Sequence, residues 1–222
     1  MSIRKMAFVI NEYYHLYNRG NSKQNIFLNK EDYVHFVKLL YLCNSTRSIT
    51  LRDITMNTYD FDREETLVNI GAYCLMPNHF HLLVKEKTEK GISKFMQKIS
   101  TAYSMYFNQK YIRTGGLFEG KFKSQHAGKD RYLKYLFSYI HLNPIKLIEP
   151  KWREKGIKNI KNAVKYLRTY HYSSYLDYLN EDRLRLKILD KNKFPKYFLS
   201  KKDFEKEIFE WLSFQDEKQL TP

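Results

Sequence analysis

Two apolar runs separated by a very short connection constrain the fold of this chain more than any other feature. The runs at 67–75 and 79–84 are rich in strand-forming residues, and Met76-Pro77-Asn78 joins them with turn chemistry. So short a connection favours two neighbouring antiparallel strands, because parallel strands need a much longer crossover. The centre of the chain is therefore predicted to be a β-hairpin in an antiparallel sheet.

The second strand of this hairpin begins with two histidines. Alternate side chains of a strand share a face, so His79 and His81 point to one side while Phe80, Leu82 and Val84 point to the core. Side by side, the two imidazoles each have a nitrogen free to bind a divalent cation. The pattern predicts half of a metal site. The alternative reading, two polar residues near a sheet edge, stays open on this strand alone.

The remaining periodicities complete a recognisable order of elements. They predict a strand at 12–18, a helix at 33–42, a polar loop at 45–66, a helix at 92–106, a fourth strand within 117–127 and a helix at 130–143. With the hairpin, the order is β-α-β-β-α-β-α. This order predicts an α+β fold: a ferredoxin-like, split βαβ antiparallel sheet with helices on one face and an extra helix.

The last of these helices carries a second candidate group of side chains. Tyr139 and Asn143 are four residues apart, so they project from one face of the helix, which Pro144 then ends. A phenol and an amide oxygen at that spacing can meet one phosphate and one cation. The helix therefore supplies two polar groups that could serve one site.

The charge of the chain indicates a polyanionic partner. There are 39 Lys and Arg against 24 Asp and Glu, a formal net charge of +15, and 19 tyrosines whose rings can stack on unpaired bases. The candidates for contact with the phosphates of such a partner are Arg19, Arg113, Lys121 and Lys123. A basic, solvated edge remains the alternative interpretation for the last three.

The composition changes after Pro150, which divides the chain into a predicted domain at 1–150 and an extension at 151–222. The extension is basic, aromatic and mainly helical: the segment 151–168 alone carries seven Lys or Arg and one Glu. It is expected either to clamp nucleic acid or to wrap the core, and its basic face fits both.

Cysteine content and hydropathy suggest where the chain works. Cys43 and Cys74 lie in apolar surroundings without a CxxC spacing, which argues against a disulfide framework and a zinc site. No run approaches the about 18 apolar residues of a membrane span, and the N-terminus lacks a signal-like apolar region. A soluble, cytoplasmic setting without a membrane partner is the default expectation.

Three ordered blocks of residues resemble a known family. Met-Pro-Asn-His-Phe-His-Leu-Leu-Val at 76–84, Gly-Leu-Phe-Glu-Gly-Lys-Phe-Lys-Ser at 116–124 and Tyr-Ile-His-Leu-Asn-Pro at 139–144 resemble the single-tyrosine HUH (IS200-like) transposases, specifically the REP-associated tyrosine transposase branch. The resemblance covers roughly residues 10–148, and Ser-Ser-Tyr at 173–175 resembles a further motif of that branch.

The resemblance implies a role for each matching residue. His79 and His81 correspond to the metal-binding histidines, Tyr139 to the nucleophile and Asn143 to the third, polar metal ligand. Tyr135 competes as nucleophile, but the residue four positions later is Tyr139, a poor ligand for a hard cation. Tyr132 has Leu136 at that offset. Glu119 departs from the family pattern, which often has Gln there, so it receives no catalytic role.

The implied activity is metal-dependent cleavage and strand transfer of single-stranded DNA in hairpin-forming palindromic repeats. Tyr139 would attack phosphorus, a 3′-hydroxyl would leave and a 5′-phosphotyrosine would form, with Mg²⁺ or Mn²⁺ as cofactor and no organic cofactor. The expected setting is bacterial and nucleoid-associated. The wider superfamily implies a homodimer and the REP-associated branch a monomer. Two rivals remain: a non-catalytic nucleic-acid-binding protein on the same fold, and a metal-dependent phosphodiesterase that uses water.

Overall fold

The computed structural model describes residues 7–48, 54, 57–179 and 182–213, and its first seven major elements follow the predicted order. They are β1 (Tyr13–Arg19), α1 (Lys30–Leu42), β2 (Val68–Met76), β3 (His79–Glu86), α2 (Gly91–Lys110), β4 (Lys123–His126) and α3 (Asp130–Leu142). The four strands form one antiparallel sheet in the order β2-β3-β1-β4. The predicted α+β fold is confirmed.

The β2–β3 hairpin has the tight connection that the sequence predicts. Met76 pairs with His79, so only Pro77 and Asn78 lie between the two strands. Farther along, the register shifts at Gly71, where a Cβ atom would lie 2.7 Å from the ring of Phe194. Only glycine allows this bulged backbone and the ring to approach so closely.

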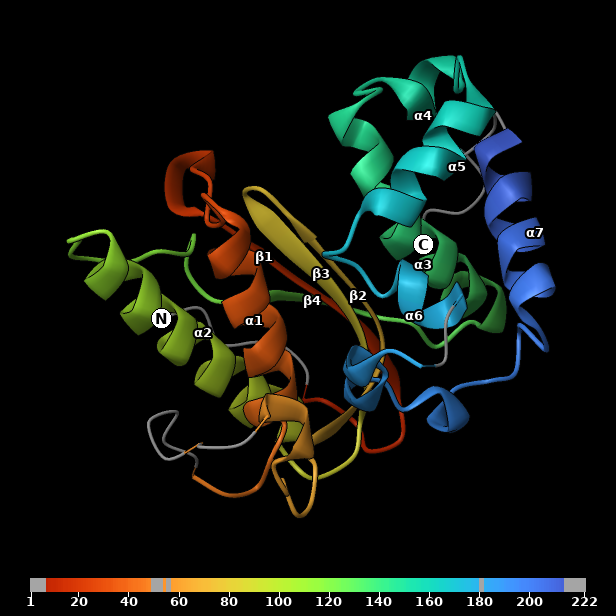
Figure 1. The fold of residues 1–222 in the computed structure, drawn as a ribbon. Coiled ribbons are helices and arrows are strands. Elements are labelled where there is room, and N and C mark those ends of the chain that lie inside the picture. Colours follow the sequence, from red (N-terminus) through yellow and green to blue (C-terminus); the bar gives the residue numbers. More distant parts are fainter. Residues whose placement is uncertain (1–6, 49–53, 55–56, 180–181, 214–222) are drawn as a thin grey trace.

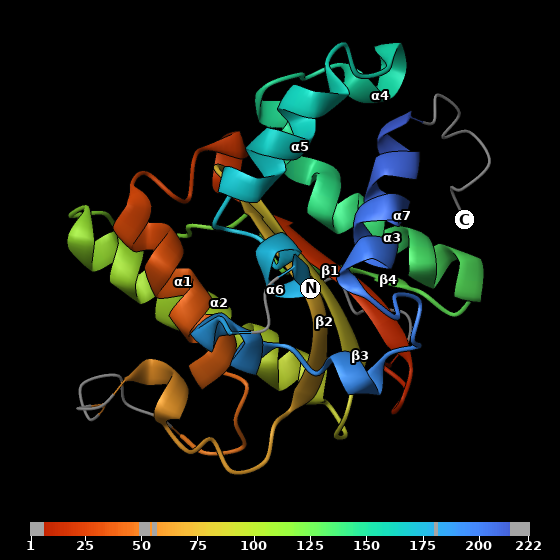
Figure 2. The same cartoon turned by 45° about the vertical axis from the view of Figure 1, so that its right-hand side comes forward.

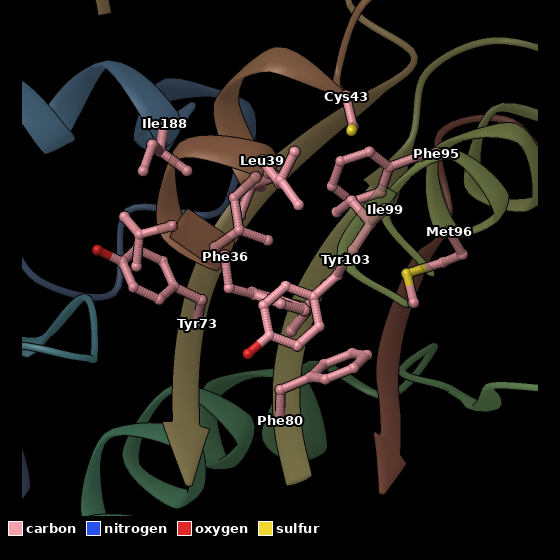
Figure 3. Close-up of a cluster of buried hydrophobic side chains, with 14 of the residues drawn as sticks. Phe36, Leu39, Cys43, Tyr73, Phe80, Phe95, Met96, Ile99, Tyr103 and Ile188 are labelled. Atoms are coloured by element: carbon pink, nitrogen blue, oxygen red, sulfur yellow. The ribbon is translucent and has the colours of Figure 1, made fainter. Parts of the chain in front are cut away.

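The two faces of the sheet pack against different helices. On the first face, Phe80 of β3 lies against Phe36 of α1 and Tyr103 of α2 (Figure 3). On the second face, Leu83 packs in a cluster with residues of α3, among them Phe137. Figure 1 shows α1 and α2 on one side of the sheet and α3 on the other. The predicted alternation of β3 is therefore confirmed: its core-facing residues meet α1 and α2, and the opposite face meets α3.

A buried carboxylate joins the start of α1 to the end of α2. Asn29 caps α1 in a reciprocal capping box with Asp32. The Asp32 carboxylate also accepts hydrogen bonds from Lys110 Nζ at 2.7 Å, Tyr106 Oη at 3.0 Å and Tyr111 Oη at 2.7 Å. These contacts hold the two helices together under the first face of the sheet.

The chain after Pro150 packs on the second face and on one sheet edge (Figure 2). It forms α4 (Trp152–Lys155), α5 (Ile160–Thr169), α6 (Tyr175–Leu179) and α7 (Lys201–Ser213). Leu75 N donates to the Tyr172 carbonyl and Ser174 N to the Tyr73 carbonyl, both at 2.9 Å, so this segment covers the outer edge of β2. Wrapping of the core, one of the two expected roles of the extension, is therefore observed.

Within the described part of the chain, none of the helices combines the length and the apolar character that a membrane crossing requires.

Candidate active site

The two histidines of β3 lie on the second face of the sheet, beneath α3. Their ring centroids are 5.0 Å apart and the rings are perpendicular. His81 is buried, with 6% of its surface exposed, whereas His79, the first residue of the strand, is partly exposed. The side-by-side arrangement that the strand period predicts is therefore present.

A third histidine joins them from the neighbouring strand. His15 of β1 pairs with Leu83 in the sheet register, so it lies diagonally across from His81 on the same face. Its Nε2 atom is 2.9 Å from His81 Nδ1. Sequence reasoning did not single out His15, although the alternation of Tyr13, His15 and Tyr17 within β1 carried the signal that it shares a face with its aromatic neighbours.

The hydrogen bonds of His79 define which of its nitrogens is free. Asn78 Nδ2 donates to the Lys23 carbonyl at 3.3 Å, and a carbonyl can only accept. Asn78 therefore presents its Oδ1 atom to His79 Nδ1, at 2.6 Å, and Nδ1 must carry the proton. The lone pair of His79 is on Nε2, which is the nitrogen available to a cation.

All three imidazoles are neutral at pH 7. Burial lowers the pKa of His15 to about 4 and is also the main cause that lowers the pKa of His79 to about 4, with further contributions from Lys146 and Arg19. Burial holds the pKa of His81 well below its ordinary value. Neutral imidazoles offer lone pairs, so the cluster has the protonation state of a ligand set.

Helix α3 brings Tyr139 against these histidines. The ring centroid of Tyr139 is 5.6 Å from the ring centroid of His15 and 5.6 Å from that of His81. The competing Tyr135 packs against Trp211 of α7, with ring centroids 4.9 Å apart. Of these two tyrosines, Tyr139 is the one whose ring lies against His15 and His81.

Asn143 follows at the end of α3 and is fully buried. Its Nδ2 atom donates to the Tyr139 carbonyl at 2.8 Å, so the Oδ1 atom of the same amide points away from that carbonyl. Among the described residues, this buried Oδ1 atom has no hydrogen-bond partner. Buried polar atoms are nearly always paired, and an amide oxygen left over is a suitable ligand for a hard cation.

The predicted ligand set combines two imidazoles with one amide oxygen. No three His, Cys, Asp or Glu side chains gather into a metal site anywhere in the described residues. The available donors are the Nε2 atom of His79, an imidazole nitrogen of His81 and the Oδ1 atom of Asn143. Two imidazoles and one amide oxygen suit Mn²⁺ well and Mg²⁺ less well.

A residue of the extension also reaches this site. The guanidinium carbon of Arg153, in α4, lies 4.3 Å from the ring centroid of Tyr139. Sequence reasoning missed Arg153 because it is one of seven basic residues in a stretch without a clear period. Nothing in that stretch distinguishes it from its neighbours.

Of the four predicted DNA-contact residues, Arg19 and Lys123 lie beside the histidines. They line a cavity of about 310 Å³ together with His79. Arg19 is paired there with the Glu119 carboxylate, which its Nη2 atom meets at 2.9 Å. Lys23, which was not among the predicted residues, adds another positive charge to the cavity.

The other two predicted DNA-contact residues lie elsewhere. Arg113 stacks its guanidinium over the ring of Phe107, 5.5 Å from the centroid. Lys121 lines a second cavity, of about 890 Å³, beside Phe8 and Phe122. The structure therefore places two of the four basic residues in the cavity beside His79, and the other two are not among the residues that line it.

The comparison with protein families agrees with the motifs of the sequence. Residues 9–143 match the family model described as transposase, IS200-like. One solved structure, of the REP-associated tyrosine transposase bound to a REP hairpin, is 13% identical, with a TM-score of 0.49 over 81% of this chain and 86% of that one. A search of curated proteins found no match. Because the family model covers more than half of the sequence, the chain belongs to the IS200-like transposase family, whose members act on DNA.

Proposed function

We propose that this protein cleaves single-stranded DNA and transfers the cut strand through a covalent bond to Tyr139. The observation that carries the proposal is the contact of the Tyr139 ring with His81 and His15, at 5.6 Å between centroids in each case. The Tyr139 ring lies against neutral imidazoles on the second face of the sheet, and the buried amide of Asn143 follows Tyr139 by four residues. The motifs at 76–84, 116–124 and 139–144 favour the REP-associated branch, and with it hairpin-forming palindromic repeats as the substrate.

His79, His81 and Asn143 are the residues that would hold Mg²⁺ or Mn²⁺. When bound, such a cation polarises a non-bridging phosphate oxygen and offsets the charge that develops during the reaction. The unpartnered Oδ1 atom of Asn143 and the proton on His79 Nδ1 support this assignment. His15 would complete it by accepting the Nδ1 proton of His81, which leaves His81 Nε2 free to bind.

In the proposed reaction, the Tyr139 oxygen attacks the scissile phosphorus. The bond from phosphorus to the 3′ oxygen breaks, the phenolic proton leaves Tyr139, and the departing 3′ oxygen takes up a proton to become a hydroxyl. The phosphotyrosine conserves the ester, so a second 3′-hydroxyl can reverse the chemistry and complete the transfer. Helix α3 holds the nucleophile because packing of its buried stripe fixes it on the sheet.

The cavity beside His79 is the proposed path of the DNA backbone. Arg19, Lys23 and Lys123 line it, and phosphate contacts of this kind hold a strand in position. Arg113 and Lys121 would contact DNA farther from the scissile phosphate. In this proposal residues 1–150 form the nuclease domain, and the basic extension at 151–222 both wraps it and adds to its attraction for DNA.

A covalent-adduct assay tests this function. The protein is incubated with Mn²⁺ and a labelled pool of single-stranded DNA in which hairpin-forming palindromes have random flanks. We expect an SDS-resistant adduct that mass spectrometry maps to Tyr139. Tyr139→Phe should abolish the adduct, and Tyr135→Phe, which alters the neighbouring tyrosine on the same helix, should retain it.

The rival functions give different results in the same assay. A non-catalytic binding protein would bind the DNA in a salt-sensitive way, without an adduct and without a response to metal. A phosphodiesterase that uses water would cut the DNA without an adduct, and Tyr139→Phe would still cut it. Either result, or an adduct that persists in Tyr139→Phe, contradicts the proposal.

A further inference from the structure

The extension places a cation directly over the proposed nucleophile. The guanidinium carbon of Arg153 is 4.3 Å from the ring centroid of Tyr139, well within the distance of a cation–π contact. The contact joins α4 of the extension to α3, two elements that are separated in sequence by a 3-10 helix at Asn143–Leu147. With Arg153 in contact, Tyr139 is half-buried.

Arg153 is itself held in place by its neighbours. Trp152 is 6% exposed and packs in the cluster that contains Leu142 and Ile145, at the end of α3. The Arg153 guanidinium also lies 5.3 Å from the Trp152 ring centroid. A buried anchor beside it and two aromatic rings around it restrict the positions that the guanidinium can adopt.

The charge of Arg153 also reaches the histidines. Burial is the main cause that lowers the pKa of His81, and the positive charge of Arg153 acts on it in the same direction. This effect is smaller than those of His15, His79 and Lys146, and the stacking of the guanidinium on the Tyr139 ring is the contact that carries the role of Arg153.

We propose that Arg153 is a positioning residue of the strand-transfer reaction: its guanidinium stacks on Tyr139 and holds the phenol in line with the scissile phosphate. This inference rests on the proposed function. A planar guanidinium suits the role because it stacks on an aromatic face and keeps its charge, whereas a lysine ammonium supplies the charge without the planar stack. The extension thereby contributes to the chemistry as well as to folding and DNA binding.

The rate of adduct formation at saturating DNA tests the proposal. Misplacement of a reacting group by about 1 Å can cost about 100-fold in rate. We therefore expect Arg153→Met to form the Tyr139 adduct about 10- to 100-fold more slowly than the wild type, with its affinity for the hairpin DNA, measured by fluorescence anisotropy, changed by less than about threefold. Arg153→Lys should give an intermediate rate, because it restores the charge alone.

Lys155→Met is the matched control, since it removes one positive charge from an exposed position of the same short helix. It should form the adduct at the wild-type rate. Thermal melting of every variant separates loss of positioning from loss of folding. If Arg153→Met melts at a lower temperature than the wild type, the rates of adduct formation of Arg153→Gln and Arg153→Lys are compared with the wild-type rate instead.

Two outcomes would overturn the positioning role. One is an Arg153→Met variant whose rate at saturating DNA is unchanged while its DNA affinity falls, because Arg153 would then be a simple phosphate contact. The other is a variant unchanged in both rate and affinity. If the wild-type protein forms no adduct at all, the proposed function fails first and the role of Arg153 falls with it, so the two failures are distinguishable.

Discussion

Replacement of His15 by phenylalanine tests the organisation of the candidate metal site. His15 is only 5% exposed and its ring packs between those of Tyr17 and Tyr139, with centroids 5.1 and 5.6 Å away. Phenylalanine keeps an aromatic ring of similar shape in this place. It removes the nitrogen that lies 2.9 Å from His81 Nδ1. The change therefore removes one hydrogen bond while it preserves most of the packing.

The expected loss follows from the proton on His81. In His15→Phe, the Nδ1 proton of His81 is either buried without an acceptor, which costs about 1–3 kcal/mol, or moves to Nε2, where it blocks the lone pair. Loss of the outer partner of a metal-binding histidine typically weakens metal affinity by about 10- to 100-fold. Those factors correspond to a loss of about 1.4–2.7 kcal/mol in binding free energy, which lies within the cost of the unpaired proton.

The assay is titration of the purified protein with Mn²⁺ at pH 7.5. Binding is measured by calorimetry and by the electron paramagnetic resonance signal of the free ion. His15→Phe should bind Mn²⁺ about 10- to 100-fold more weakly than the wild type. His15→Gln, which can offer an amide oxygen as acceptor, should lose less. His81→Ala provides the reference for a lost ligand.

Equal Mn²⁺ affinity of His15→Phe and the wild type, together with a clear loss in His81→Ala, would refute the role given to His15. Failure of the wild-type protein to bind Mn²⁺ would instead contradict the metal site itself. Melting temperatures of the variants show whether a weaker affinity reflects a disturbed fold.

Three further predictions concern stability. Burial lowers the folded-state pKa of His15 to about 4, below the value of about 6.5 in the unfolded chain. As the pH falls, the unfolded chain therefore binds a proton on His15 before the folded protein does. The contribution of neutral His15 to stability is complete above about pH 6.5 and is lost as the pH falls towards 4. Urea unfolding should show that wild type loses about 2 kcal/mol more than His15→Phe between pH 7 and pH 5, and parallel curves would contradict this. Asp32→Asn should lower the unfolding free energy by about 3 kcal/mol in urea melts, because Lys110 loses a buried ionic partner. Asn44→Ala should cost about 2–4 kcal/mol in the same melts, since a buried amide that pairs with two backbone N–H groups and one carbonyl at the start of β2 is removed; an unchanged midpoint would argue against it.

The DNA-contact residues show where reasoning from composition ends. The net charge of +15 pointed to a polyanionic partner, and the chain belongs to a family that acts on DNA. Composition could not distinguish the positions of individual charges. Arg19 and Lys123 lie beside His79, while Arg113 and Lys121 do not. Arg19 and Lys123 lie at the ends of β1 and β4 and Arg113 and Lys121 in connecting segments, so their places depend on how the strands pair and how those segments fold.

Local periodicity determined the parts of the site that lie within one element. A period of two residues placed His79 and His81 side by side on a strand, and a period of about 3.6 placed Tyr139 above Asn143 on a helix. These are properties of the backbone itself, so they can be predicted before the fold is known. The role of Asn143 as a ligand remains a prediction that metal binding can test.

The tertiary structure decided which other residues join them. His15 reaches His81 only because β1 pairs with β3 in one register, and a shift of one residue would turn it to the opposite face. Arg153 reaches Tyr139 from α4, whose Trp152 packs in the cluster at the end of α3. The free energy of these contacts comes from packing between elements that are distant in sequence. No local pattern encodes such a contact, so the sequence predicted the histidines, the tyrosine and the amide, and the fold supplied the residues that hold them.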